Sequence, residues 1–141
     1  MNQSKKLLKA TLQMDEDAVA EMLEGVHDDM HEFKEYNNEN TLKCVIHLAY
    51  YAAMDSYELK FEESAGKGIA DCIMIPRRAG TPGIILELKY NGSTEDALTQ
   101  IQEKNYLAGM PEVVKQVIMV GINYDKKTKK HECRIKSANI S

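Results

Sequence analysis

The sequence has no tryptophan, only two phenylalanines and only three cysteines among its 141 residues. Cys44, Cys72 and Cys133 are scattered, odd in number and nowhere spaced as CxxC, so they support neither a zinc knuckle nor a disulfide framework. Because a buried thiol packs like a small apolar group, we expect Cys44 and Cys72 to fill space in the core. We also expect the chain to work in a reducing compartment, the cytoplasm.

Long apolar runs are absent as well, since no stretch approaches the roughly 18 to 20 residues that a membrane-spanning helix needs. The first 17 residues are too polar, and soon too acidic, for a signal peptide. The phosphate-binding pattern GxxxxGK[ST] does not occur. We therefore expect no membrane segment and no ATPase module within this sequence.

An excess of positive charge is also missing, because the formal net charge is -4. This balance argues against strong overall attraction to nucleic acid. Local attraction remains open, since carboxylates that hold a metal ion count as negative only until the ion binds. The length of 141 residues and the 43% hydrophobic content fit one soluble domain with a sizeable core.

Hydrophobic periodicity and turn signals predict an alternation of helices and strands. Residues 1–13 form either a short amphipathic helix or a connector, and Asp15 is expected to cap a helix over 15–35. The elements expected after it are a helix over 41–54, strands over 57–63, 69–76 and 83–90, a helix from 93 to about 109, and strands over 114–122 and 131–136. A strand–helix–strand passage implies a crossover, so we expect a mixed sheet.

The stretch from Gly66 to Lys89 organises this pattern, because two neighbouring apolar strands within it carry charged residues. Glu87 and Lys89 lie two residues apart and so point to the same face of their strand. A hairpin brings Asp71, which lies 16 residues before Glu87, to the neighbouring strand. Burying charge is costly unless the charge is paired or binds a metal, so two carboxylates and a lysine predict a divalent-metal site.

Plainer interpretations accompany these residues. A Glu-x-Lys pair on a strand is commonly a solvated salt bridge, although the apolar flanks of Glu87 favour a central, buried strand. Glu39, before the helix over 41–54, either stabilises the positive end of that helix or reaches the sheet and helps to hold a metal. His27 and His31 share one helix face, where a solvated polar face is the alternative to a metal pair.

The motifs together resemble the PD-(D/E)XK nuclease superfamily. The similarity covers residues 36–137 and is closest to the nuclease domain at the C-terminal end of bacterial and archaeal AAA-ATPase-like proteins. The stretches that carry it are GKGIAD (66–71), ILELK (85–89), ALTQI (97–101) with Lys104 and Tyr106, VIMVGIN (117–123), and Asn38-Glu39-Asn40. Ala70 replaces the proline of the superfamily's name, and Lys43, Ser64 and Ile69 also depart from the pattern of this branch.

The resemblance implies an α/β fold with a restriction-endonuclease-like core, in which helices flank a mixed central β-sheet in the order αβββαβ, with an extra N-terminal helix. It divides the compact chain into a helical extension over 1–35 and a nuclease-like domain over 36–141. It implies that Asp71, Glu87 and Lys89 are catalytic. Expected metal ligands are Asp71, Glu87, the backbone carbonyl of Leu88, and Glu39.

The resemblance also implies a metal-dependent nuclease that uses Mg²⁺ or Mn²⁺, because hard carboxylate oxygens suit these ions. Gln100, Tyr106 and Lys67 are expected to contact substrate, although QxxxY spacing from Gln102 leaves the register of that motif open. The plainer alternatives are helix surface for Gln100, the edge of the core for Tyr106 and a solvated turn for Lys67. DNA is the favoured substrate over RNA. Further partners are an ATPase domain or protein, or a second copy in a homodimer. The alternative function is a non-catalytic module that binds nucleic acid or protein.

Overall fold

The computed structural model describes residues 3–29, 46, 49–63, 70–103 and 110–139. Within these residues the chain forms helices, a short 3₁₀ helix and five strands. In chain order they are α1 (Gln3–Leu12), α2 (Glu16–Asp29), η1 (Tyr51–Asp55), β1 (Tyr57–Glu63), β2 (Ala70–Pro76), β3 (Gly83–Tyr90), α4 (Thr94–Glu103), β4 (Gln116–Asp125) and β5 (Lys130–Asn139).

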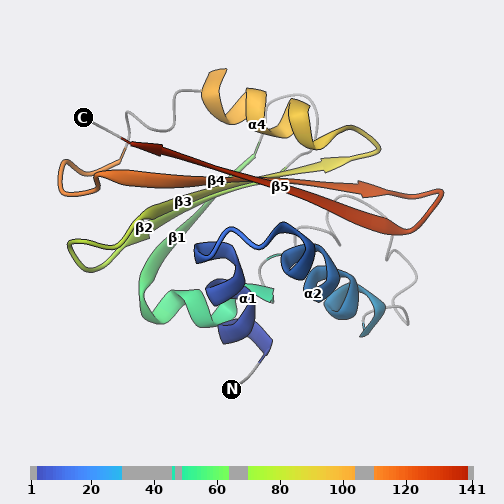
Figure 1. Cartoon of the computed structure of the whole chain (residues 1–141), viewed down its shortest axis with the longest axis horizontal. Coiled ribbons are helices and arrows are strands. Elements are labelled where there is room, and N and C mark those ends of the chain that lie inside the picture. Colours follow the sequence, from blue (N-terminus) through green and yellow to red (C-terminus); the bar gives the residue numbers. More distant parts are fainter. Residues whose placement is uncertain (1–2, 30–45, 47–48, 64–69, 104–109, 140–141) are drawn as a thin grey trace.

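The five strands form one mixed sheet in the order β1-β2-β3-β4-β5. β3 and β4 are parallel and are joined through α4, whereas every other neighbouring pair is antiparallel. Figure 1 shows α4 on one face of the sheet, with α1, α2 and η1 against the other. The predicted α/β fold with a mixed central sheet is therefore confirmed.

Apolar residues fill both faces of the sheet, because the central strands lie between two helical layers. Along β3, Ile84, Leu86 and Leu88 belong to the core on the α1 and α2 side. Ile85, between them, packs with Leu98 of α4 in a second core. A strand buried on both faces explains the nearly continuous apolar run of β3.

The N-terminal helices pack against the sheet. Asp15 caps α2, since its Oδ1 accepts a hydrogen bond from the amide of Ala18 at 3.2 Å, as predicted. The buried Thr11 hydroxyl donates to the carbonyl of Leu7 at 2.9 Å, so the hydroxyl of Tyr50, 2.8 Å away, donates to Thr11. This buried pair ties α1 to the segment before η1.

The last two strands differ from the sequence prediction in extent. β4 begins at Gln116, two residues after its predicted start at 114, and runs on to Asp125. β5 extends from Lys130 to Asn139, beyond both predicted ends, because it pairs with β4 along its whole length. Asp125 stabilises the turn between the two strands by accepting a hydrogen bond from the amide of Lys127 at 2.8 Å. The predicted helix over 41–54 lies largely outside the described residues, and its described end, η1, is a 3₁₀ helix.

Cys72 is 1% exposed, which confirms its predicted place in the core, and Cys133 is also buried. Cys44, His31 and the predicted domain boundary near residue 35 lie outside the described residues, so these predictions stay untested. No helix in the described part of the chain is long and apolar enough to cross a membrane.

Candidate functional site

One row of paired residues crosses the sheet at the centre of the candidate site. Asp71 of β2 lies directly opposite Glu87 of β3 in the antiparallel register, as the hairpin prediction requires. Glu87 in turn lies beside Gly121 of β4. Residues directly opposite in an antiparallel pair share a face and have Cβ atoms about 4.5 to 5.5 Å apart. The backbone therefore brings two carboxylate-bearing residues together.

Asp71 and Glu87 lie on the face of the sheet that α4 covers. Ile85 packs against α4, and strand alternation places Glu87 and Lys89 on the same face. Glu87 is 0% exposed and Lys89 is 6% exposed. The solvated salt bridge considered from the sequence is therefore wrong, because both charged residues are buried.

The start of α4 is fixed directly beside Glu87. The hydroxyl of Ser93 accepts a hydrogen bond from the amide of Asp96 at 3.0 Å, so Ser93 caps the start of α4. A Cβ added to Gly121 would lie 2.8 Å from the backbone carbonyl oxygen of Thr94 and 3.1 Å from the Cβ of Ala97. The first turn of α4 thus rests on the backbone of β4 because residue 121 has no side chain.

A turn fixes the end of β3 just after Lys89. The Oδ1 of Asn123, which is 6% exposed and lies beside Lys89 in the parallel register, accepts a hydrogen bond from the amide of Gly92 at 2.8 Å. Asn91 has a φ of 54° and donates its amide to the carbonyl of Tyr124 at 2.8 Å. Asn123 therefore holds the backbone that follows Lys89.

Asn123 is a site residue that the sequence argument did not single out. The signal was a polar residue at the end of the apolar VIMVGIN run, on a strand predicted to be central. Its partner is the Gly92 amide of a distant turn, and this pairing follows only from the parallel register of β3 and β4.

The other predicted site residues lie on α4, in the core, or outside the described residues. Gln100 is half-buried on α4. The side chain of Leu88 is 4% exposed in the core on the opposite face, so only its backbone carbonyl is available to a ligand. Glu39, Lys67 and Tyr106 lie outside the described residues, as does the side chain of Asp71.

The donor set fits a divalent cation by its chemistry. Asp71 and Glu87 supply hard oxygen ligands, which Mg²⁺ and Mn²⁺ prefer. A carboxylate that is 0% exposed, like Glu87, is costly to bury unless hydrogen bonds, a cation or a metal offset the lost hydration. Among the side chains that the structure describes, no three His, Cys, Asp or Glu residues gather closely enough to hold a metal, and of the predicted carboxylates only Glu87 has a described side chain.

Basic residues lie at both ends of the sheet. Arg77 and Arg78 follow β2 at the far end of the hairpin from Asp71, a separation of about 20 Å along the strand. The exposed turn of Lys126, Lys127 and Lys129 lies instead at the end of β4, and the Lys126 amide donates to the Oδ1 of Asn91 at 2.9 Å. This basic turn is therefore at the same end of the sheet as Lys89.

Comparison with known proteins agrees with this geometry. Residues 37–133 match the family model of the PD-(D/E)XK nuclease superfamily. A search of curated proteins found no match. The matched region contains the hairpin of β2 and β3, the paired positions of Asp71 and Glu87, and α4. Because the match spans more than half of the sequence, the chain belongs to the PD-(D/E)XK nuclease superfamily.

Proposed function

We propose that the chain is a divalent-metal-dependent nuclease that hydrolyses phosphodiester bonds, with DNA as its substrate and Mg²⁺ or Mn²⁺ as its metal. Members of the superfamily typically use divalent metal ions. The observation that carries the proposal is the pairing of Asp71 with Glu87 on neighbouring strands, with Lys89 buried two residues further along β3.

In this proposal Asp71, Glu87 and the backbone carbonyl of Leu88 would hold the ion, together with Glu39 directly or through water. Leu88 directly follows Glu87, and its side chain lies in the core on the opposite face, so its backbone carbonyl is the atom that it would offer to the ion. A bound divalent ion lowers the pKa of its water and offsets the charge of the phosphate.

Lys89 has a separate role in the proposal. Its ammonium has no lone pair for a metal, but it donates up to three hydrogen bonds. It would hold the attacking water in line with the phosphate or stabilise the negative charge that develops on the phosphate oxygens. The hydrogen bond from Gly92 to Asn123 supports this role, because it fixes the backbone that carries Lys89.

Substrate contacts are proposed for Gln100, Tyr106 and Lys67. The exposed lysines after β4 would add contacts to phosphates, because they lie at the same end of the sheet as Lys89. Such contacts supply sequence-independent affinity that weakens as salt rises. This local positive charge compensates for the overall net charge of -4.

The direct test is incubation with labelled single- and double-stranded DNA and RNA in Mg²⁺, Mn²⁺ or EDTA. We expect metal-dependent cleavage of DNA that EDTA abolishes. The isosteric changes Asp71→Asn and Glu87→Gln should each reduce cleavage by at least about 100-fold, because each removes a charged ligand. Circular dichroism on the same samples checks that the variants stay folded.

Glu58→Gln is the matched control, because Glu58 is an exposed carboxylate on β1 of the same sheet. It should leave cleavage unchanged. Full activity of either ligand variant, or cleavage that persists in EDTA, would contradict the proposed site. If no nucleic acid is cut with any metal, the proposed activity is wrong, and a binding assay with the same labelled substrates then tests the non-catalytic alternative.

A further inference from the structure

Among the described residues, β5 forms an outer edge of the sheet, because it pairs with β4 on one side and ends the strand order. Its pairing with β4 is continuous from Lys130 to Asn139. In such a strand, every second backbone amide points away from the neighbour, toward the open edge. Exposed edge amides are a template for pairing with another strand, so natural proteins cover or disrupt them.

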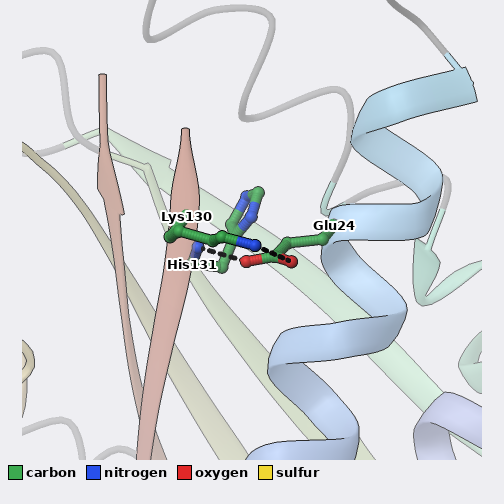
Figure 2. Close-up of polar contacts among 3 residues, drawn as sticks. All are labelled: Glu24, Lys130 and His131. Carbon is green, nitrogen blue, oxygen red and sulfur yellow. Dashed lines mark hydrogen bonds and ion pairs between the residues drawn. The ribbon is translucent and has the colours of Figure 1, made fainter. Parts of the chain in front are cut away.

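Two carboxylates of α2 occupy this edge. The amide of His131 donates to Oε1 of Glu24 at 2.9 Å, and the amide of Ile135 donates to Oε2 of Glu16 at 2.7 Å. Figure 2 shows Glu24 reaching from α2 to the His131 backbone, with the Lys130 ammonium 3.8 Å from its other oxygen. Helix side chains thus accept edge hydrogen bonds that a strand would otherwise accept.

The spacing of the two contacts matches along both elements. Glu16 and Glu24 are eight residues apart, or about 12 Å along a helix. His131 and Ile135 are four residues apart, or about 13 Å along a strand. α2 therefore runs antiparallel to β5, and its two glutamates have the same spacing as the outward-pointing amides of His131 and Ile135.

The packing of α2 holds this arrangement in place. Val19 and Leu23 are both 0% exposed in the core shared with Cys133, and half-buried Ala20 lies between the two glutamates. Burial raises the pKa of the Cys133 thiol to about 12, and the negative charge of Glu16 adds to the increase. α2 is thus packed on the face of β5 that carries Cys133, while its two glutamates accept the hydrogen bonds of the edge amides.

We propose that α2, through Glu16 and Glu24, covers the β5 edge and thereby prevents β5 from pairing with β5 of a second copy of the chain. A second copy fits because an antiparallel pair centred on Cys133 would set Glu132 of each copy opposite Arg134 of the other. Opposite charges directly across a strand pair are stabilising, and this pair closes with two-fold symmetry. Glu132 and Arg134 are both exposed, so neither holds the monomer together through burial.

The test combines Glu16→Ala with Glu24→Ala and measures mass by light scattering over a range of concentrations. The wild-type chain should remain at its monomer mass of 15.9 kDa, whereas the double variant should shift reversibly toward twice that mass. Glu21→Ala is the matched control, because Glu21 is an exposed carboxylate on the same helix. This control should remain monomeric.

The charge pair identifies the interface. Adding Arg134→Glu to the double variant sets like charges opposite each other and should restore the monomer. Adding Glu132→Arg as well should restore the dimer. The proposal would be overturned if the double variant remains monomeric, or if its association is the same with and without the changes at Arg134 and Glu132.

A second measurement covers the case in which the double variant fails to fold. Hydrogen exchange of the wild-type chain should show slow exchange for the amides of His131 and Ile135, although they lie on a sheet edge. Exchange at these two amides should become at least 10-fold faster in the single variants Glu24→Ala and Glu16→Ala respectively. Rapid exchange of both amides in the wild type would show that α2 does not cover the edge and would also overturn the proposal.

Discussion

Glu87 and Lys89 carry opposite charges and are both buried on one face of a central strand. A substitution at either residue therefore changes how buried charge is compensated. Where buried charges of opposite sign compensate each other, removing one leaves the other uncompensated, at a typical cost of about 3 to 5 kcal/mol. A divalent ion restores the compensation for a carboxylate. We therefore expect stability and metal binding at these residues to be coupled, and both need to be measured alongside activity.

Lys89→Ala should preserve or increase the affinity for Mn²⁺ while reducing turnover by at least about 100-fold. The reason is that Lys89 cannot ligate the metal, and its loss leaves the charge of Glu87 available to the ion. Calorimetric titration with Mn²⁺ and cleavage rates on the same preparations check this. Lys115→Ala, which changes an exposed lysine, is the control. Loss of both affinity and activity would mean that Lys89 holds the site together instead.

The sequence predicted the paired residues of the candidate site, but it did not predict every residue that fixes the backbone around them. The pairing of Asp71 with Glu87 was predictable because a short hairpin leaves little freedom of register between two strands. Asn123 was not predictable in the same way, because its hydrogen bond to Gly92 depends on the crossover that sets β4 beside β3. The roles of Glu39, Lys67 and Tyr106 stay predictions, since these residues lie outside the described chain.

At the scale of elements, the central strands were the most predictable. β3 has the bounds 83–90 that the sequence indicated, because its apolar run is bounded by turn residues on both sides. The covering role of α2 was not visible in the sequence. Glu16 and Glu24 look like ordinary helix-surface charges until β5, more than 100 residues later, is placed beside them.

Gly121→Ala tests how α4 is held on the sheet. The added methyl group would lie 2.8 Å from the backbone carbonyl oxygen of Thr94, and backbone cannot move aside as a side chain can. We expect a loss of about 1 to 3 kcal/mol in the free energy of unfolding, together with reduced cleavage, because α4 would shift beside Glu87. Urea denaturation and the nuclease assay measure the two effects.

A matched substitution separates this effect from a general sensitivity of the chain to added methyl groups. Gly25→Ala places a methyl group on α2, where nothing lies within 4 Å, and it should be neutral or slightly stabilising. Equal stability of the Gly121→Ala variant and the wild type would show that α4 is not packed tightly against β4.

At the scale of the whole molecule, the layer of α1, α2 and η1 buries several acidic hydroxyl and thiol groups against the sheet. Burial raises the pKa of Tyr57 from 10.0 to about 12, and it raises the pKa of Tyr50 further. Burial and the charge of Glu16 raise the pKa of Cys133 from 9.0 to about 12. At a pH between the ordinary pKa of one of these groups and its raised pKa, the unfolded chain has lost a proton that the folded chain retains. The free energy of unfolding must therefore fall as pH rises through this interval.

We expect stability to be independent of these three groups below pH 9 and to decline between about pH 9 and pH 12. Cys133 acts first, because its ordinary pKa of 9.0 is the lowest of the three, and it alone contributes up to about 1.4 kcal/mol per pH unit. Urea denaturation at pH 7, 9, 10 and 11 under a reducing agent measures the slope. Cys133→Ala should flatten the slope between pH 9 and 10 and leave the steeper loss above pH 10, where the tyrosines titrate in the unfolded chain. The same slope in this variant and the wild type would mean that the Cys133 thiol reaches solvent in the folded chain, which would contradict its burial in the core that it shares with Val19 and Leu23.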